Sequence, residues 1–234
     1  MAEFSEAIIT AILLIFELDA ELTEIVALSL RISLSAVLFA GIIGMPIGAL
    51  LAIFKFRGKF FIVVIMNAMM GMPPVVVGLI VYLLLSRSGP FGVFGLLFTP
   101  TAMIIAQVLL VTPIISALTR QIVEDLWIEY EEQLRSLGAT HISAIPALLW
   151  DGRFTLITAI LAGFGRAAAE VGGVMIVGGN IDHVTRVMTT SIALEVSKGN
   201  LSLALGLGII LLLLSASVNG AAYIIQNSTR RWHS

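Results

Sequence analysis

The stretch EYEEQLRSLGATHISAIPALLW, residues 129–150, interrupts a chain that is otherwise strongly apolar. Hydrophobic residues make up 59% of the 234 residues, and charged residues only 12%. That composition lies outside the range of soluble globular domains and is typical of a protein that spans a bilayer. A charged, interrupted helical segment in the middle of such a chain is therefore expected to lie in water, between two membrane spans.

The apolar stretches on either side of this segment predict the fold class, because a bilayer span takes roughly 20 apolar residues. Five stretches qualify, at residues 23–53, 60–86, 95–118, 154–177 and 201–225. Residues 4–16 are apolar but short and are followed by acidic residues, so residues 1–22 are predicted to form an interfacial helix. The prediction is an all-α membrane protein with one transmembrane domain, residues 23–225, and a short tail, residues 226–234.

The basic residues predict the orientation, because cytoplasmic loops carry the excess of lysine and arginine. With the N-terminus outside, the loops and tail on one side hold eight basic residues, and those on the other side hold three. The eight are Lys55, Arg57, Lys59, Arg120, Arg135, Arg153, Arg230 and Arg231. This larger group marks the cytoplasm, which puts the C-terminus and the segment 120–153 on the cytoplasmic side.

Within that segment, apolar residues recur at spacings of three and four, which is typical of an amphipathic helix. They are Leu126, Tyr130, Leu134 and Leu137. Gly138 follows, where a glycine commonly ends a helix in a left-handed conformation. Thr140 or Ser143 could cap a second short helix. A Thr140 cap would leave Pro146 inside the helix, whereas a Ser143 cap would put Pro146 in the tolerated first turn. On pattern alone, the alternative is an ordinary amphipathic loop.

Three parts of the sequence resemble one family. Glu132, followed six residues later by Gly138, is similar to the EAAxxxG loop of permease subunits in binding-protein-dependent ABC importers. Residues 72–92, MPPVVVGLIVYLLLSRSGPFG, resemble the second core span and following loop of the molybdate and sulfate permeases. Residues 163–195, with their Gly-Arg-Ala, Glu-Val-Gly and Gly-Gly-Asn-Ile runs, look most like the tungstate permease branch.

The resemblance implies a type I importer transmembrane domain that translocates its cargo without catalysing a reaction. It assigns coupling to an ATPase to Glu132, Leu137, Gly138, Ala139 and Thr140. It also implies three partners, namely a separate ATP-binding subunit, an extracytoplasmic substrate-binding protein and a second copy of the chain, in a prokaryotic cell membrane. The sequence contains no GxxxxGK[ST] phosphate loop, as expected if another subunit binds ATP.

The cargo implied by the resemblance is a tetrahedral oxyanion, with tungstate expected first and molybdate or sulfate as alternatives. A more remote alternative is an ion-coupled secondary transporter that uses Glu170 as a proton relay. The net charge of -2 gives no basic surplus for nucleic acid. The chain has no cysteine, and its three histidines are scattered, so we expect no cofactor and no metal site.

The second predicted span contains the first candidate for a gate or path. Pro73 and Pro74 remove two backbone donors and should break the helix, and irregular backbone at membrane depth usually lines a path. Met70 and Met72 lie next to them, with flexible side chains suited to a seal. The alternative is a structural kink in which methionine fills gaps.

The fourth predicted span contains the second candidate. Arg166 and Glu170 are four residues apart, so a continuous helix would put both on one face, within pairing distance. Ionisable residues within a span are costly and are functional candidates by default. The alternative is a self-neutralising pair that fixes helix packing. In the first span, Gly44 and Gly48 have the GxxxG spacing, which often means only a close helix contact.

Overall fold

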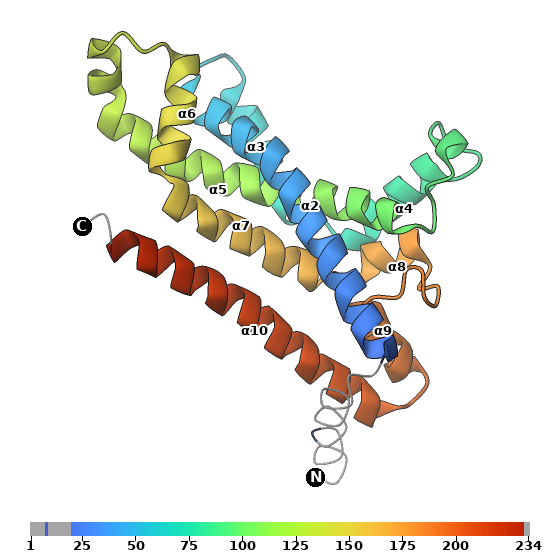
Figure 1. Ribbon diagram of the computed structural model, residues 1–234. Coiled ribbons are helices and arrows are strands. Elements are labelled where there is room, and N and C mark those ends of the chain that lie inside the picture. The colour runs from blue at the N-terminus through green and yellow to red at the C-terminus, as the bar shows by residue number, and fades with distance from the viewer. Residues whose placement is uncertain (1–7, 9–19, 232–234) are drawn as a thin grey trace. The chain divides into compact units, whose positions relative to one another are not determined.

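The computed structural model describes Ile8 and residues 20–231, in which every regular element is a helix (Figure 1). The all-α prediction is confirmed for these residues, whereas the interfacial helix predicted for residues 1–22 falls almost entirely outside them. The helices are α2 (Ala20–Ile53), α3 (Lys59–Met70), α4 (Pro74–Leu85), η1 (Gly92–Phe94), α5 (Pro100–Ser136), α6 (His141–Asp151), α7 (Arg153–Ala168), α8 (Gly172–Gly178), α9 (Met188–Ser197) and α10 (Leu201–Arg231).

Among the described residues, α2, α5 and α10 are each long and apolar enough to cross a membrane. The number of candidate spans rises to five when the pairs α3 with α4 and α6 with α7 each count as one bent span. The prediction of about five spans agrees with this count. The helix that contains the third predicted span, α5, continues without a break past residue 118 to Ser136, so the amphipathic stretch forms its last turns.

The fourth predicted span, residues 154–177, was wrong as a single helix. α7 ends at Ala168 and α8 begins at Gly172, so Glu170 lies in the interruption and not on a common helix face with Arg166. The carboxylate Oε1 of Glu170 accepts a hydrogen bond from the backbone N–H of Gly173, at 2.9 Å. A side chain that bonds the backbone of the next turn competes with helix continuation, and two adjacent glycines weaken the helix further.

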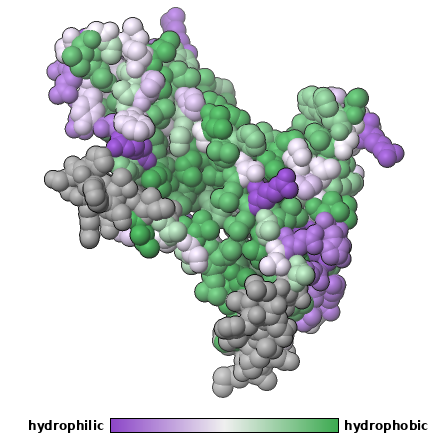
Figure 2. All heavy atoms as spheres, in the orientation of Figure 1, coloured by the Kyte–Doolittle hydropathy of each residue, from purple (hydrophilic) through white to green (hydrophobic). Residues whose placement is uncertain are grey.

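The chain divides into two compact units. Unit 1 contains residues 1–35, 73–107 and 167–221, and unit 2 contains residues 36–72, 108–166 and 222–234. In Figure 2, hydrophilic side chains of unit 1 gather over the α8–α9 region, and those of unit 2 gather near the end of α5 and the start of α6. Both regions contain a connection between helices, where polar residues meet water.

In unit 1, apolar and charged contacts join the start of α2 to α9, α10 and the loop before α9. The apolar cluster contains Leu22, Ile25, Met188, Leu207 and Ile210, from α2, α9 and α10. The loop before α9 is tied to α2 by His183, whose Nδ1 lies 2.8 Å from a carboxylate oxygen of Glu24. The hydrogen bond from Glu24, followed by the charge of Asp182, raises the pKa of His183 above its ordinary value.

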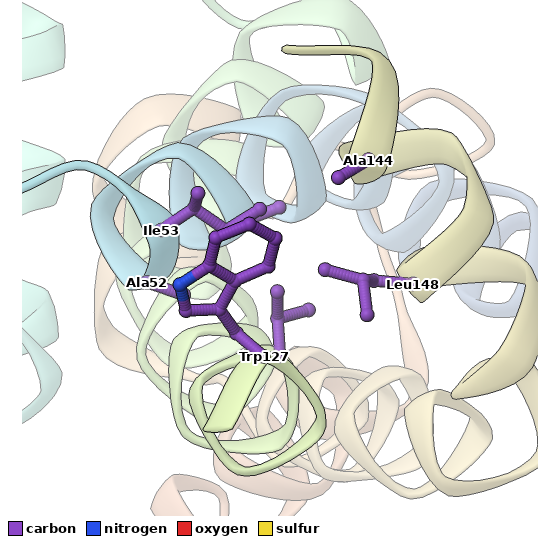
Figure 3. Close-up of a cluster of buried hydrophobic side chains, with 7 residues drawn as sticks. Ala52, Ile53, Trp127, Ala144 and Leu148 are labelled. Atoms are coloured by element: carbon purple, nitrogen blue, oxygen red, sulfur yellow. The ribbon is translucent and has the colours of Figure 1, made fainter. Parts of the chain in front are cut away.

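The core of unit 2 joins the C-terminal end of α2 and the later part of α5 to α6 (Figure 3). Its buried residues are Ala49, Ala52, Ile53, Val123, Trp127, Ala144 and Leu148. Just before the α2 residues of this cluster, the GxxxG glycines Gly44 and Gly48 lie against α5. A Cβ on Gly44 would be 3.1 Å from Ser116 Oγ, and one on Gly48 would be 2.4 Å from the Ser116 carbonyl oxygen. The expectation of a close helix contact at this motif is confirmed.

Candidate functional site

The turn between α5 and α6 has the hydrogen bonds of a Schellman motif. The N–H of Gly138 donates to the carbonyl of Arg135 at 3.0 Å, and the N–H of Ala139 donates to the carbonyl of Leu134 at 2.9 Å. Gly138 has a φ of 80°, which confirms the left-handed conformation predicted for it. A Cβ at this position would meet nothing within 4 Å, so the turn requires glycine for its backbone angle and not for space.

Thr140 is the N-cap of α6, which decides between the two caps that the sequence left open. Its side chain accepts the backbone N–H of Ser143 at 3.2 Å, and Ser143 Oγ accepts the N–H of Thr140 at 2.8 Å. This reciprocal capping box satisfies two donors that the first turn leaves without partners. Pro146 consequently lies in the helix interior, where it is exposed and its missing N–H costs one backbone hydrogen bond.

Aromatic packing fixes α6 against the rest of unit 2. Trp127 of α5 is buried beside Ile53 of α2 and Leu148 of α6, as Figure 3 shows. The ring of His141, the first residue of α6, lies 5.5 Å from the Trp127 ring and 5.6 Å from the Phe54 ring, measured between centroids. One face of the segment is therefore packed on the ends of two long helices, which gives it a defined position.

The opposite face of the segment is exposed and partly apolar. Leu137 is 82% exposed, Ile142 69% and Trp150 70%. Glu132 is also exposed, in the last turns of α5. Large exposed apolar side chains together with a charged residue are typical of a surface that contacts another protein. The residues assigned to coupling by the resemblance thus belong to one turn and its two flanking helices.

Glu132→Lys is expected to weaken the contact made by this surface without unfolding the chain. Glu132 is exposed and makes no ion pair within the described residues, so charge reversal removes no internal partner. A charge at the rim of an interface typically changes the association rate and its dependence on salt more than it changes folding. The measurement is the salt dependence of binding to the ATP-binding subunit that the resemblance implies. The neighbour Glu131, which pairs with Arg135 at 2.7 Å, provides the control Glu131→Gln.

Pro73 and Pro74 lie at a break between helices, as predicted. α3 ends at Met70, and Pro74 is the first residue of α4, where the missing N–H of proline costs nothing. The carbonyl of Pro73 accepts the N–H groups of Val76 at 3.0 Å and Val77 at 3.3 Å. Met72 lies within the break and is half-buried.

In unit 1, the segment after the prolines packs closely on the segment after Glu170. A Cβ on Gly78 of α4 would lie 2.7 Å from Gly173 Cα, and a Cβ on Gly173 would lie 2.9 Å from the Pro74 carbonyl oxygen. Glu170 is 3% exposed and caps the same Gly173. The structure therefore brings Pro74 and Glu170 together at the start of two short helices. Met70, Met72 and Arg166 belong to unit 2.

The roles of Arg166 and Glu170 can be separated by substitution. Arg166→Ala is expected to lower the yield of folded protein if the pair is structural, and Glu170→Gln in the same background should restore much of it, because no buried carboxylate then remains uncompensated. Glu170→Gln keeps an acceptor for the Gly173 N–H, whereas Glu170→Ala removes it at a cost of about 0.5–2 kcal/mol. The measurement is monodisperse yield and thermal unfolding in detergent. Normal yield of Arg166→Ala with lost transport would instead indicate a role in the path.

Sequence patterns did not identify two groups that support the segment. One is Trp127, which belongs to a stretch predicted to be an amphipathic helix in water but is only 5% exposed. The other is a charged cluster in which Glu124 pairs with Arg120 and with Lys59 Nζ at 3.5 Å, while Lys59 also donates to the Ala52 carbonyl at 3.0 Å. The i,i+4 spacing of Arg120 and Glu124 was the only local signal for it.

Comparison with known proteins gives one family and several relatives. The model of the family described as "binding-protein-dependent transport system inner membrane component" matches residues 44–231. Over 226 residues, the chain is 38% identical to the tungstate uptake system permease protein TupB of Peptoclostridium acidaminophilum, which covers 97% of this chain and 99% of that protein. It is 40% identical over 213 residues to a probable anion ABC transporter permease protein of Haloferax volcanii, covering 89% and 92% of the two chains.

A more distant relative is the sulfate transport system permease protein CysT of Escherichia coli. The identity is 27% over 170 residues, which covers 70% of this chain and 61% of that protein. The first two relatives, in contrast, match nearly end to end.

Proposed function

The chain belongs to the family of inner-membrane components of binding-protein-dependent transport systems, and from this premise we propose that it is the permease subunit of a tungstate importer. The observation that carries the proposal is the 38% identity to a tungstate permease along 97% of the chain. A second tungstate permease, from Campylobacter jejuni, is 36% identical over 209 residues. Sulfate permeases are less similar, which favours tungstate, with molybdate and then sulfate as the next cargoes to test.

In the proposed mechanism, a binding protein delivers the oxyanion to the outer face, and a separate ATPase closes on binding ATP. The exposed turn around Leu137, Gly138 and Ala139 contacts the ATPase, with Glu132 and Thr140 on its two flanking helices. Because α6 is packed on α2 and α5 through Trp127, a displacement of the turn is passed to the long helices. The permease itself makes and breaks no covalent bond.

The breaks beside Pro73–Pro74 and at Glu170 are the proposed path or gate. Short helices that start within an apolar region expose backbone groups to a cavity, as occurs where membrane proteins bind or pass solutes. The close α4–α8 contact through Gly78 and Gly173 supports a gate that moves these two short helices together. Met70, Met72 and Arg166 are proposed to contribute the seal and the cationic group.

Reconstituted uptake tests this function. Vesicles that contain the permease, its ATPase and its binding protein should accumulate tungstate only when ATP is supplied, and excess sulfate should compete less well than molybdate. Accumulation driven by a proton gradient without the ATPase would contradict the proposal. It would favour a secondary transporter, and loss of that uptake in Glu170→Gln would then identify the proton relay.

The proposed topology has the N-terminus outside and residues 226–234 in the cytoplasm, with two copies of the chain around one path. An accessibility tag after Ser234 should be protected in intact cells, and one before Glu3 should be exposed, as the excess of basic residues on one side requires. A protected N-terminal tag would contradict this orientation.

Cross-linking in the native membrane should give a species of twice the chain mass, which tests the homodimer.

A further inference from the structure

An apolar groove in unit 2 lies beside the bend between α6 and α7, where the helix direction changes by 79°. It has a volume of about 210 Å³. The groove is lined by Met45, Leu149, Arg153, Leu156, Ile157 and Ile160. Five of these side chains are apolar, and Arg153 is the single charged group among them. The groove thus combines a hydrocarbon wall with one cation, and none of the residues assigned to coupling or to the proposed gate lines it.

Arg153 is held in place by aromatic rings and by the backbone. Its guanidinium carbon lies 4.7 Å from the centroid of the Trp150 ring and 4.4 Å from that of the Phe154 ring. Its Nη1 donates to the Trp150 carbonyl at 2.6 Å. No carboxylate of the described residues pairs with it, in contrast to Arg120, Arg135 and Arg186. Its positive charge is therefore oriented but not neutralised.

We propose that this groove binds one anionic phospholipid, with the phosphate group at Arg153 and part of an acyl chain along the apolar wall. The inference rests on the proposed function, which puts the α6–α7 bend at the cytoplasmic surface of the membrane. A basic pocket between helices on that side attracts anionic headgroups, and tryptophan is enriched at the same depth. The positive N-terminal end of the 16-residue α7 adds to the attraction.

A bound lipid would brace the segment that contacts the ATPase. Leu149 belongs to α6, Leu156 and Ile157 belong to α7, and Met45 belongs to α2, so an acyl chain in the groove contacts all three helices. It would hold α6 at its angle to α7 during coupling. The occupant we choose is a lipid and not the ATPase, because most of the groove wall is apolar and belongs to helices that cross the membrane.

Quenching of tryptophan fluorescence by brominated lipids tests the site directly. Trp150 is 70% exposed and lies against Arg153, so it reports on lipid beside the groove. The full chain, with Trp232→Phe to remove one other fluorophore, is reconstituted in phosphatidylcholine vesicles that contain the same mole fraction of brominated phosphatidylglycerol or brominated phosphatidylcholine. A single arginine near an anionic surface should give an about fivefold preference for phosphatidylglycerol.

Three variants make the result specific. Arg153→Gln should lose the preference, and Arg153→Lys, which keeps the charge, should retain most of it. Arg57→Gln is the matched control, because Arg57 is an exposed cation proposed for the same side but lies outside the groove. Equal quenching by both lipids in the starting protein, or an unchanged preference in Arg153→Gln, would overturn the proposal.

The assay needs neither the ATPase nor transport, so it fails separately from the proposed function. Lipid preference without ATP-dependent uptake would contradict the proposed function and support the lipid site. ATP-dependent uptake without lipid preference would support the proposed function and contradict the lipid site. If Arg153→Gln loses ATPase binding equally in detergent without lipid and in vesicles, the groove cation contacts protein, and the lipid proposal is wrong.

Discussion

Gly138→Val is expected to weaken association with the ATPase strongly while the chain remains inserted in the membrane. Gly138 has a φ of 80°, and a β-branched residue there is a genuine conformational outlier. The left-handed conformation costs an L-residue roughly 1–2 kcal/mol, so the turn should give way and α6 should lose its direction. The measurement is co-purification of the ATPase with the permease, together with ATP hydrolysis that depends on transport. We expect at least a roughly tenfold loss of both.

Two controls separate the turn from general strain. Gly138→Asn should be milder, because asparagine tolerates the left-handed region. Gly58, before α3, also has a positive φ, 94°, with nothing within 4 Å of a Cβ, so Gly58→Val introduces the same kind of strain at another turn of unit 2. If Gly138→Val associates normally with the ATPase at normal expression, or if Gly58→Val loses association to the same degree, the segment is an ordinary loop.

Among the glycines of α2, Gly48→Ala is expected to have the largest effect on folding. The added Cβ would lie 2.4 Å from the Ser116 carbonyl oxygen and 2.8 Å from Thr119 Cβ. The nearest atom is backbone, which cannot move aside by changing a rotamer, so α2 and α5 must separate along their contact. Overpacking of a tight contact costs about 1–3 kcal/mol and sometimes more. The measurement is the yield of monodisperse protein in detergent and its thermal unfolding temperature.

Other glycines in long helices provide a graded comparison. Gly44→Ala should be less harmful, because its Cβ would meet Ser116 Oγ and Thr112 O at 3.1 Å, which a small shift relieves. Gly208→Ala in α10 meets nothing within 4 Å and should be neutral or stabilising, since alanine favours a helix over glycine by about 0.5–1 kcal/mol. Equal stability of Gly48→Ala and Gly208→Ala would show that α2 and α5 do not pack as described.

Several features followed from the sequence because each depends on a few adjacent residues. Long apolar stretches predicted about five spans, since the length needed to cross a bilayer is a local property. The paired prolines predicted the end of α3, and the glycine after an amphipathic stripe predicted the positive φ at Gly138. The helix end and the positive φ each depend on the backbone preference of a single residue type, proline in the first case and glycine in the second.

Other features depend on contacts between residues that are distant in the chain. Local pattern allowed Thr140 or Ser143 to cap α6, and the Thr140 cap was selected because it puts His141, Ala144 and Leu148 against α2 and α5. The burial of Trp127 of α5 in the same cluster likewise depends on contacts with α2 and α6. Periodicity within one segment says only which side chains share a face; what that face packs against was decided by the tertiary structure.

The interruption at residues 169–171 has the same explanation. In isolation, residues 154–177 are apolar enough to form one helix, and the spacing of Arg166 and Glu170 fits that helix. In the folded unit 1, Glu170 caps Gly173, the Glu170 carbonyl accepts a hydrogen bond from Thr189 at 2.8 Å, and Gly173 packs on Pro74. The sequence by itself determined the membrane class and the turn chemistry. The tertiary structure decided where the fourth helix breaks, because the contacts that stabilise the break come from α4 and α9.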